Sequence, residues 1–186
     1  MDKVRHNPLK TLITMLAALV ILGPGSPALA DDLHLEQAAP PATLVTLDGQ
    51  SIATHDLLGR TVILTFWATW CEPCQRELPL LSRYAAAHRD QRLVVLGFCL
   101  DDSDNLDKVR TVAKQLSFPV GLLGQSKARG YGRMWRIPVS FVIDRSGLLR
   151  YDGWQASQPV WSEASLNQVV GPLLAGPKKA ATDVKR

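Results

Sequence analysis

The stretch that decides the fold is TFWATWCEPC, residues 65–74. It begins inside an apolar run over residues 61–67 that is rich in β-branched and aromatic residues, as in a strand buried on both faces. Cys71 and Cys74 follow as a C-x-x-C pair where a segment with helical periodicity begins. The sequence therefore predicts two cysteines on the first turn of a helix that directly follows a buried strand.

This position is chemically favourable for a reactive cysteine. Backbone N–H groups at a helix N-terminus are unpaired and carry a partial positive charge. That charge stabilises a thiolate at Cys71, so we expect its pKa to fall below the ordinary value of about 8.5. Pro73 suits the first helical turn, where its missing N–H costs nothing. Because only two residues separate Cys71 from Cys74, their disulfide can form and break without unfolding.

Other uses of a C-x-x-C pair need residues that this sequence lacks. A zinc site needs two more ligands, but there is no second C-x-x-C, and the four histidines lack the spacing of a metal site. Attachment of a c-type haem needs a histidine after the second cysteine, where Gln75 stands. A static disulfide over so short a loop would add little stability. Redox chemistry is the favoured interpretation, with a metal site or an inert disulfide as minority alternatives.

The rest of the chain alternates between strand and helix patterns. Strands are expected over residues 42–47 and 50–53, joined by an Asp-Gly turn, and over 61–67, 93–100, 118–123, 139–144 and 148–151. Helices are expected over 74–88, 104–116, 126–135 and 162–174, the second capped by Ser103 or Asp104. This order predicts one α/β domain near residues 42–175. It has a central mixed sheet, helices on both faces and an N-terminal β-hairpin extension.

The two ends of the chain differ from this body. Residues 1–30 have the order of a secretory signal peptide, with a basic start, an apolar run over 12–22 and an A-x-A site over 28–30. The run is shorter than the ~20 residues of a membrane span, but an uncleaved, tilted anchor and a buried helix stay open as alternatives. We expect residues 31–41 to be a linker and 176–186 to be a basic flexible tail. The domain then works in an oxidising compartment, the periplasm.

Composition excludes several classes of protein. Hydrophobic residues make up 46% and charged residues 20%, which is ordinary for a folded globule and unlike a disordered chain. The net charge of +4 comes from the two ends, and no basic stripe runs through the near-neutral body. We therefore expect no nucleic-acid binding. Three cysteines are too few for a disulfide framework, and Cys99 is expected to be a small buried core residue, with a regulatory thiol as the alternative.

The motif FWATWCxPC, residues 66–74, resembles the TlpA/ResA-like family of exported thiol–disulfide oxidoreductases. The Glu-Pro pair between the cysteines is typical of ResA-type members. The likeness extends over nearly all of residues 42–175, through Leu47-Asp48-Gly49, Leu58-Gly59-Arg60, Glu77-Leu78-Pro79, Phe118-Pro119-Val120 and residues 137–144. It implies a thioredoxin-like fold and a redox-active cysteine pair that needs no soluble cofactor.

The resemblance also implies roles for residues outside the cysteine pair. Pro138 matches a cis-proline opposite the active cysteines, and the backbone of Ile137 would pair with an extended client segment. ResA-like members carry an acid that takes part in proton transfer after the strand over 93–100. Asp102 aligns best with it, and Asp101 would replace it after a one-residue slip, while a helix-capping or solvated acid is an equal alternative.

Two residues adjoin the nucleophile. Trp70 precedes Cys71 in the motif and is expected to support the site. Glu72 follows Cys71, and as an anion it would disfavour the thiolate and oppose the helix terminus. Its replacement by a neutral residue would therefore make the pair more oxidising.

The sequence departs from the family around the proline. Arg136 stands two places before Pro138, where members have a small residue, and Val139 replaces the usual threonine. The branch dedicated to cytochrome c maturation tends to have glutamate there, so Val139 argues against that branch. Arg133, Trp135 and Arg136 would crowd the rim of the client groove. Recognition of an acidic or apolar client and simple exposure are both open.

We predict a monomeric periplasmic reductase of protein disulfides, in which Cys71 attacks the client and Cys74 resolves the mixed disulfide. The resemblance implies a membrane-embedded thiol reductant of the DsbD/CcdA type, and clients such as apocytochrome c and copper-site assembly factors. A disulfide oxidase or isomerase of the same fold stays open. A copper-binding assembly factor is the alternative from another class, although those proteins carry C-x-x-x-C. A peroxiredoxin needs P-x-x-x-T-x-x-C, and Leu64 and Ala68 stand at its Pro and Thr positions.

Overall fold

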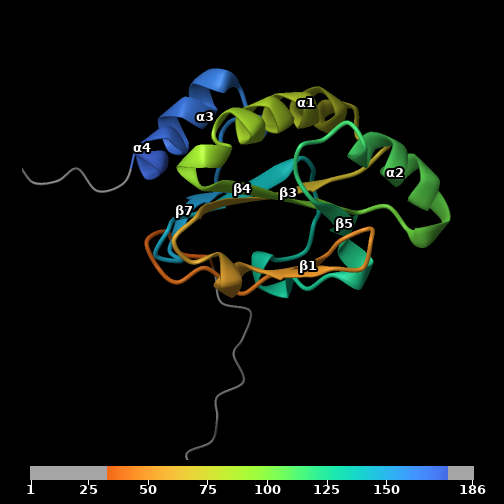
Figure 1. The fold of residues 1–186 in the computed structure, drawn as a ribbon, viewed down its shortest axis with the longest axis horizontal. Coiled ribbons are helices and arrows are strands. Elements are labelled where there is room, and N and C mark those ends of the chain that lie inside the picture. Colours follow the sequence, from red (N-terminus) through yellow and green to blue (C-terminus); the bar gives the residue numbers. More distant parts are fainter. Residues whose placement is uncertain (1–32, 176–186) are drawn as a thin grey trace, which may run out of the picture.

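The computed structural model describes residues 33–175, and the predicted signal peptide and basic tail lie outside the described residues. Its centre is a five-stranded mixed sheet in the order β5-β4-β3-β6-β7 (Figure 1). The strands are β3 (Thr61–Trp67), β4 (Leu93–Cys99), β5 (Val120–Leu122), β6 (Val139–Ile143) and β7 (Leu149–Asp152). β3, β4 and β5 are parallel, and β6 and β7 join them antiparallel, which confirms the predicted mixed sheet.

β3 lies at the middle of the sheet because its continuous apolar run suits burial on both faces. All seven of its residues are buried. It pairs with β4 from Thr61 opposite Leu93 to Trp67 opposite Cys99, and with β6 as far as Phe66 opposite Val139. The C-terminal ends of β3 and β4 and the start of β6 therefore meet at one end of the sheet, which is called its site edge below.

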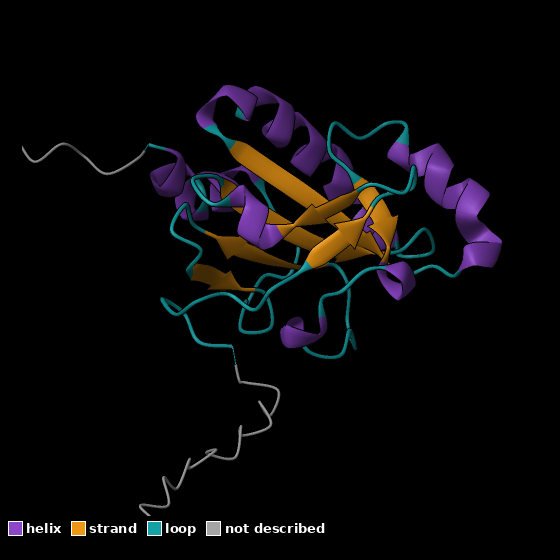
Figure 2. Ribbon diagram, turned by 60° about the horizontal axis from the view of Figure 1, so that its bottom comes forward, coloured by secondary structure: helices purple, strands orange, loops and turns teal. Residues whose placement is uncertain are grey.

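Different elements cover the two faces of the sheet. The α-helices are α1 (Glu72–Ala87), α2 (Leu106–Ala113), α3 (Glu163–Val169) and α4 (Gly171–Leu174). Their apolar side chains, including Leu78, Val109 and Leu166, share one core cluster. The opposite face carries the hairpin of β1 (Thr43–Val45) and β2 (Ser51–Ala53), with short 3₁₀ helices (Figure 2). The expected N-terminal hairpin is thus present as a separate two-stranded sheet.

The hairpin lies against the β5 edge of the central sheet. Leu47 N donates to Val120 O at 3.0 Å. Gly121 makes this approach possible, because a Cβ there would lie 1.9 Å from the carbonyl oxygen of Val45. A side chain at this position would push the hairpin away from β5.

The helix predicted over residues 126–135 is wrong. The segment contains a single 3₁₀ turn, Arg129–Tyr131, and is otherwise irregular. Gly132 ends the turn at φ +83°, and Gly130 packs so closely on Pro40 that a Cβ would lie 2.3 Å from that ring. These glycines and their tertiary contacts override the helical composition of the segment.

The prediction of a linker over residues 31–41 is also wrong for residues 33–41, which the structure describes. Glu36 N donates to Leu149 O at 2.7 Å, and Leu149 N donates to Gln37 O at 2.8 Å. Ala39 N donates to Gly147 O at 2.9 Å. The segment therefore covers the free edge of β7, and the folded domain begins before residue 42.

Two helix ends differ from expectation. α2 begins at Leu106 without a side-chain cap, because Ser103–Asn105 form a 3₁₀ turn, so the predicted Ser103 or Asp104 cap is wrong. The helix expected over 162–174 begins with a capping box at Ser162 but divides into α3 and α4 before Gly171-Pro172. None of the helices that residues 33–175 form is long and apolar enough to cross a membrane.

Candidate redox site

Cys71 and Cys74 form a disulfide at the N-terminus of α1, directly after the loop that follows β3. Cys71 is the N-cap of α1, and its Sγ accepts a hydrogen bond from Cys74 N at 3.2 Å. Pro73 lies in the first turn of this helix, where it displaces no hydrogen bond. Cys71 is 5% exposed and Cys74 is 1% exposed, so Cys71 is the more accessible sulfur. Trp70, directly before the pair, is among the most exposed large side chains of the described residues.

The loop that leads into Cys71 is held through Thr69. The Thr69 N–H donates to Asp101 Oδ2 at 2.7 Å, and the Thr69 hydroxyl donates to Asp101 Oδ1 at 2.6 Å. On the other side, Gln75 Nε2 donates to Thr69 O at 2.5 Å. The end of β4 and the first turn of α1 therefore fix the loop together, which keeps the cysteine pair in place.

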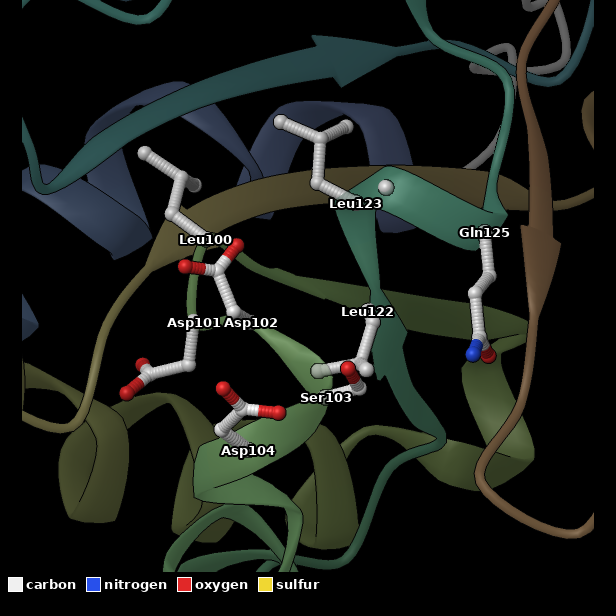
Figure 3. A pocket seen from close by; sticks show the side chains of 9 residues that line it. Leu100, Asp101, Asp102, Ser103, Asp104, Leu122, Leu123 and Gln125 are labelled. Carbon is white, nitrogen blue, oxygen red and sulfur yellow. The ribbon is translucent and has the colours of Figure 1, made fainter.

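Asp101, not Asp102, faces the active-site loop, which corrects the preferred alignment. Burial raises the pKa of Asp101, but hydrogen bonds from the Thr69 side chain and backbone outweigh it and hold the pKa below its usual range. Both residues line an open hollow beside β5, but Asp102 is exposed while Asp101 is buried, and Figure 3 shows the two carboxylates pointing in different directions. Successive side chains of an extended segment point to opposite sides, so a one-residue slip exchanges their surroundings. Asp101 is thus an ionised anchor for the loop.

Cys99 contributes to the same anchor. Its thiol is fully buried at the end of β4 and donates to Asp101 Oδ2 at 3.2 Å. Burial raises the pKa of Cys99 to about 12, so it stays a thiol at neutral pH. The expectation of a small buried core residue is confirmed, and the structure adds the hydrogen bond to Asp101.

The Glu72 carboxylate is directed to solvent and paired with a cation. Its side chain is exposed to solvent and forms an ion pair with Arg76, one turn along α1. Solvent screens its charge and Arg76 partly neutralises it, so its influence on Cys71 is weaker than adjacency in the sequence implies.

We expect Glu72→Gln to shift the redox potential of the pair by less than about 20 mV, toward the oxidising side, because exposed charges interact weakly. Equilibration of both proteins with glutathione buffers measures the shift. A shift above about 60 mV would mean that the Glu72 charge acts on Cys71 directly.

Glu77 entered the family resemblance but was given no role at the site. It is 2% exposed, and its Oε2 accepts a hydrogen bond from Trp161 N at 2.7 Å. Burial raises the pKa of Glu77 to about 7, against the opposing effect of that hydrogen bond. It follows Cys74 by three residues and so lies on the same side of α1. The available signal was a carboxylate beside Leu78 and Leu81 on the apolar face of the helix.

Ile137 and Pro138 lie at the site edge of the sheet, as the two cysteines do. Phe66 is opposite Val139, so Pro138 lies at the end of β3 that leads to Cys71. The Ile137–Pro138 peptide bond is cis, as the resemblance implies. Ile137 packs against the core cluster that contains both cysteines. Among residues 33–175, no three His, Cys, Asp or Glu side chains gather as a metal site would require.

A thioredoxin-like sheet that presents a C-x-x-C disulfide at a helix N-terminus defines a thiol–disulfide oxidoreductase. The chain belongs to the AhpC/TSA family, whose model matches residues 35–152. Within that family the chain lacks the peroxiredoxin motif, because Leu64 and Ala68 stand at the positions where a peroxiredoxin has Pro and Thr.

Individual relatives agree with this class. The thiol-disulfide oxidoreductase ResA of Bacillus cereus is 28% identical over 117 residues, which cover 63% of this chain and 68% of the relative. The thioredoxin-like protein YneN of Bacillus subtilis is 29% identical over 61% of this chain and 68% of its own. A crystal structure of a thiol:disulfide interchange protein from Chlorobium tepidum is 27% identical and superimposes with a TM-score of 0.62, covering 77% of this chain and 99% of its own. The resemblance to ResA-like oxidoreductases is confirmed.

Proposed function

We propose that this thiol–disulfide oxidoreductase acts in the periplasm as a reductase of protein disulfides. The observation that supports electron transfer to the client is the ionised carboxylate of Asp101, which holds the loop that leads into Cys71. Negative charge near the pair disfavours the Cys71 thiolate, and a strong oxidant needs that thiolate stabilised. Asp101 therefore favours the disulfide over the dithiol, as in a reductase.

The geometry supports a two-step transfer. The Cys71 thiolate attacks one sulfur of a client disulfide, a mixed disulfide forms and the other client sulfur leaves as a thiolate. Cys74 then loses its proton and attacks the Cys71 sulfur, which releases the client as a dithiol and leaves the Cys71–Cys74 disulfide. Two electrons have moved to the client. Glu77, with a pKa of about 7 and on the same side of α1, is suited to accept the Cys74 proton.

Location and partners follow from the ends of the chain and from the resemblance. Residues 1–30 have the features of an export signal, cleaved or retained as an inner-membrane anchor, which supports a periplasmic site. A membrane-embedded thiol reductant of the DsbD/CcdA type would regenerate the dithiol. Cysteine pairs of apocytochrome c or of copper-site proteins are the proposed clients, and Val139 favours the second group.

We expect the redox potential to lie nearer the roughly −270 mV of thioredoxin than the roughly −120 mV of a strong oxidant. The gap corresponds to about 7 kcal/mol for a two-electron couple, so the outcome is unambiguous. Equilibration with dithiothreitol and glutathione buffers, read by thiol alkylation and mass spectrometry, gives the value. A potential above about −150 mV would favour the oxidase interpretation. Tight stoichiometric binding of copper by the reduced protein would favour the copper-binding alternative instead.

A further inference from the structure

Two tryptophans stack at the end of the sheet that carries the redox site. The rings of Trp135 and Trp154 lie 5.3 Å apart between centroids with an interplanar angle of 17°. Trp154 is held firmly, because its Nε1 donates to Tyr131 O at 2.8 Å and its backbone N–H donates to Asp152 Oδ1 at 2.9 Å. Trp135 is 70% exposed, so a fixed indole supports a large apolar surface open to solvent.

Arg136 positions this stack. Its guanidinium carbon lies 5.2 Å from the ring centroid of Trp135 and 5.7 Å from that of Trp154. Its Nη2 donates to Gly153 O at 2.7 Å and to Trp154 O at 2.8 Å, while its Nε is buried without a hydrogen-bond partner. Arg136, which stands where family members have a small residue, therefore links the segment before Pro138 to the loop after β7. With these donors directed inward, Arg136 offers little to a client carboxylate.

The stack lies at the same end of the sheet as the proposed client site. Trp135 precedes Ile137 by two residues, and Ile137 and Pro138 lie at the sheet edge where β3 leads to Cys71. Trp70, on the other segment that meets at this edge, is 69% exposed. Tryptophan is enriched at binding surfaces because its ring offers a large apolar contact area.

We propose that the Trp135–Trp154 stack is a subsite that binds an apolar side chain, aromatic or aliphatic, close to the client cysteine that Cys71 attacks. The inference rests on the proposed function and adds a class of substrate to it. Aromatic stacking and apolar burial supply the attraction, and Arg136 acts as a positioning residue from behind. Clients with an apolar residue beside the reactive cysteine should thus react faster than clients with polar residues.

The test uses short peptides that carry one cysteine as a mixed disulfide with glutathione. Three peptides differ only in the residues beside the cysteine, which are Phe and Leu, Ser and Gly, or Glu and Asp. Stopped-flow measurement with the reduced wild-type protein should show about tenfold faster reduction of the apolar peptide than of the Ser and Gly peptide. Trp135→Ala should lower this ratio to about two or less, and Trp135→Phe should restore most of it.

Two controls separate the subsite from general damage. Leu58→Ala removes another exposed apolar side chain, 63% exposed against 70% for Trp135. It precedes β3 at the opposite end of the sheet, so this variant should keep the preference. Leu58→Ala should also reduce hydroxyethyl disulfide at the wild-type rate. The Trp135 variants are compared by the ratio of their rates for the three peptides, so a general change in activity cancels.

Three outcomes would overturn the subsite: equal rates of the wild-type protein for all three peptides, a preference that survives Trp135→Ala, or faster reduction of the acidic peptide. Failure of the wild-type protein to reduce hydroxyethyl disulfide itself would instead remove the proposed reductase function on which the subsite rests.

Discussion

Replacing Cys74 with alanine should trap clients on the protein as mixed disulfides and reduce turnover to the background rate. Cys71 remains the accessible sulfur at the helix N-terminus and still attacks, but no second thiol is present to release the client. Non-reducing electrophoresis should show adducts that disappear with dithiothreitol, and mass spectrometry of the adducts should place the client on Cys71. The same experiment identifies clients.

Cys71→Ala is the matched control, since it keeps the more buried cysteine and removes the N-cap sulfur. It should trap little, because Cys74 is 1% exposed. Equal trapping by the two variants would show that the roles of nucleophile and resolving cysteine are assigned wrongly. Adducts that also persist in the Cys71→Ala, Cys74→Ala double variant would point to Cys99.

Glu77→Gln should abolish a large pH dependence of stability. The pKa of Glu77 is about 7 in the folded protein, against an ordinary value of 4.5. Between these values the folded state holds the proton and the unfolded state has lost it, so stability falls as pH rises from about 4.5 to about 7. The loss is about 3 kcal/mol for this one group. Urea unfolding of the oxidised protein at pH 5 and pH 8 measures it.

The glutamine variant suits this test because its amide oxygen can still accept the Trp161 N–H. Its unfolding free energy should change far less between pH 5 and pH 8, and it should be the more stable protein at pH 8. Glu72→Gln serves as the control on the same helix and should keep the wild-type pH dependence. If wild-type and Glu77→Gln unfold with the same pH dependence, Glu77 is already ionised at pH 5. Its role as a proton acceptor for Cys74 would then fail too.

Local patterns in the sequence determined much of this protein. The apolar run of residues 61–67 became β3 with the predicted bounds, and the strands over 93–100 and 139–144 were shifted by only one residue at one end. Period and composition suffice there because buried strands need long apolar runs whatever their neighbours are. The C-x-x-C disulfide at a helix start is equally local, since the two cysteines lie within one turn.

The tertiary structure decided which of the neighbouring residues serve the site. Asp101 meets Thr69 from 32 residues away, and Glu77 meets Trp161 from 84 residues away, so neither contact has a local signal. The same holds for segment 126–135. Its composition favours a helix, but its contacts with Pro40 and Thr43 hold it in an irregular conformation. Burial and hydrogen-bond partners set whether a carboxylate is an ionised anchor, a group that titrates near pH 7 or a solvated surface charge. Those surroundings exist only once distant segments have packed together.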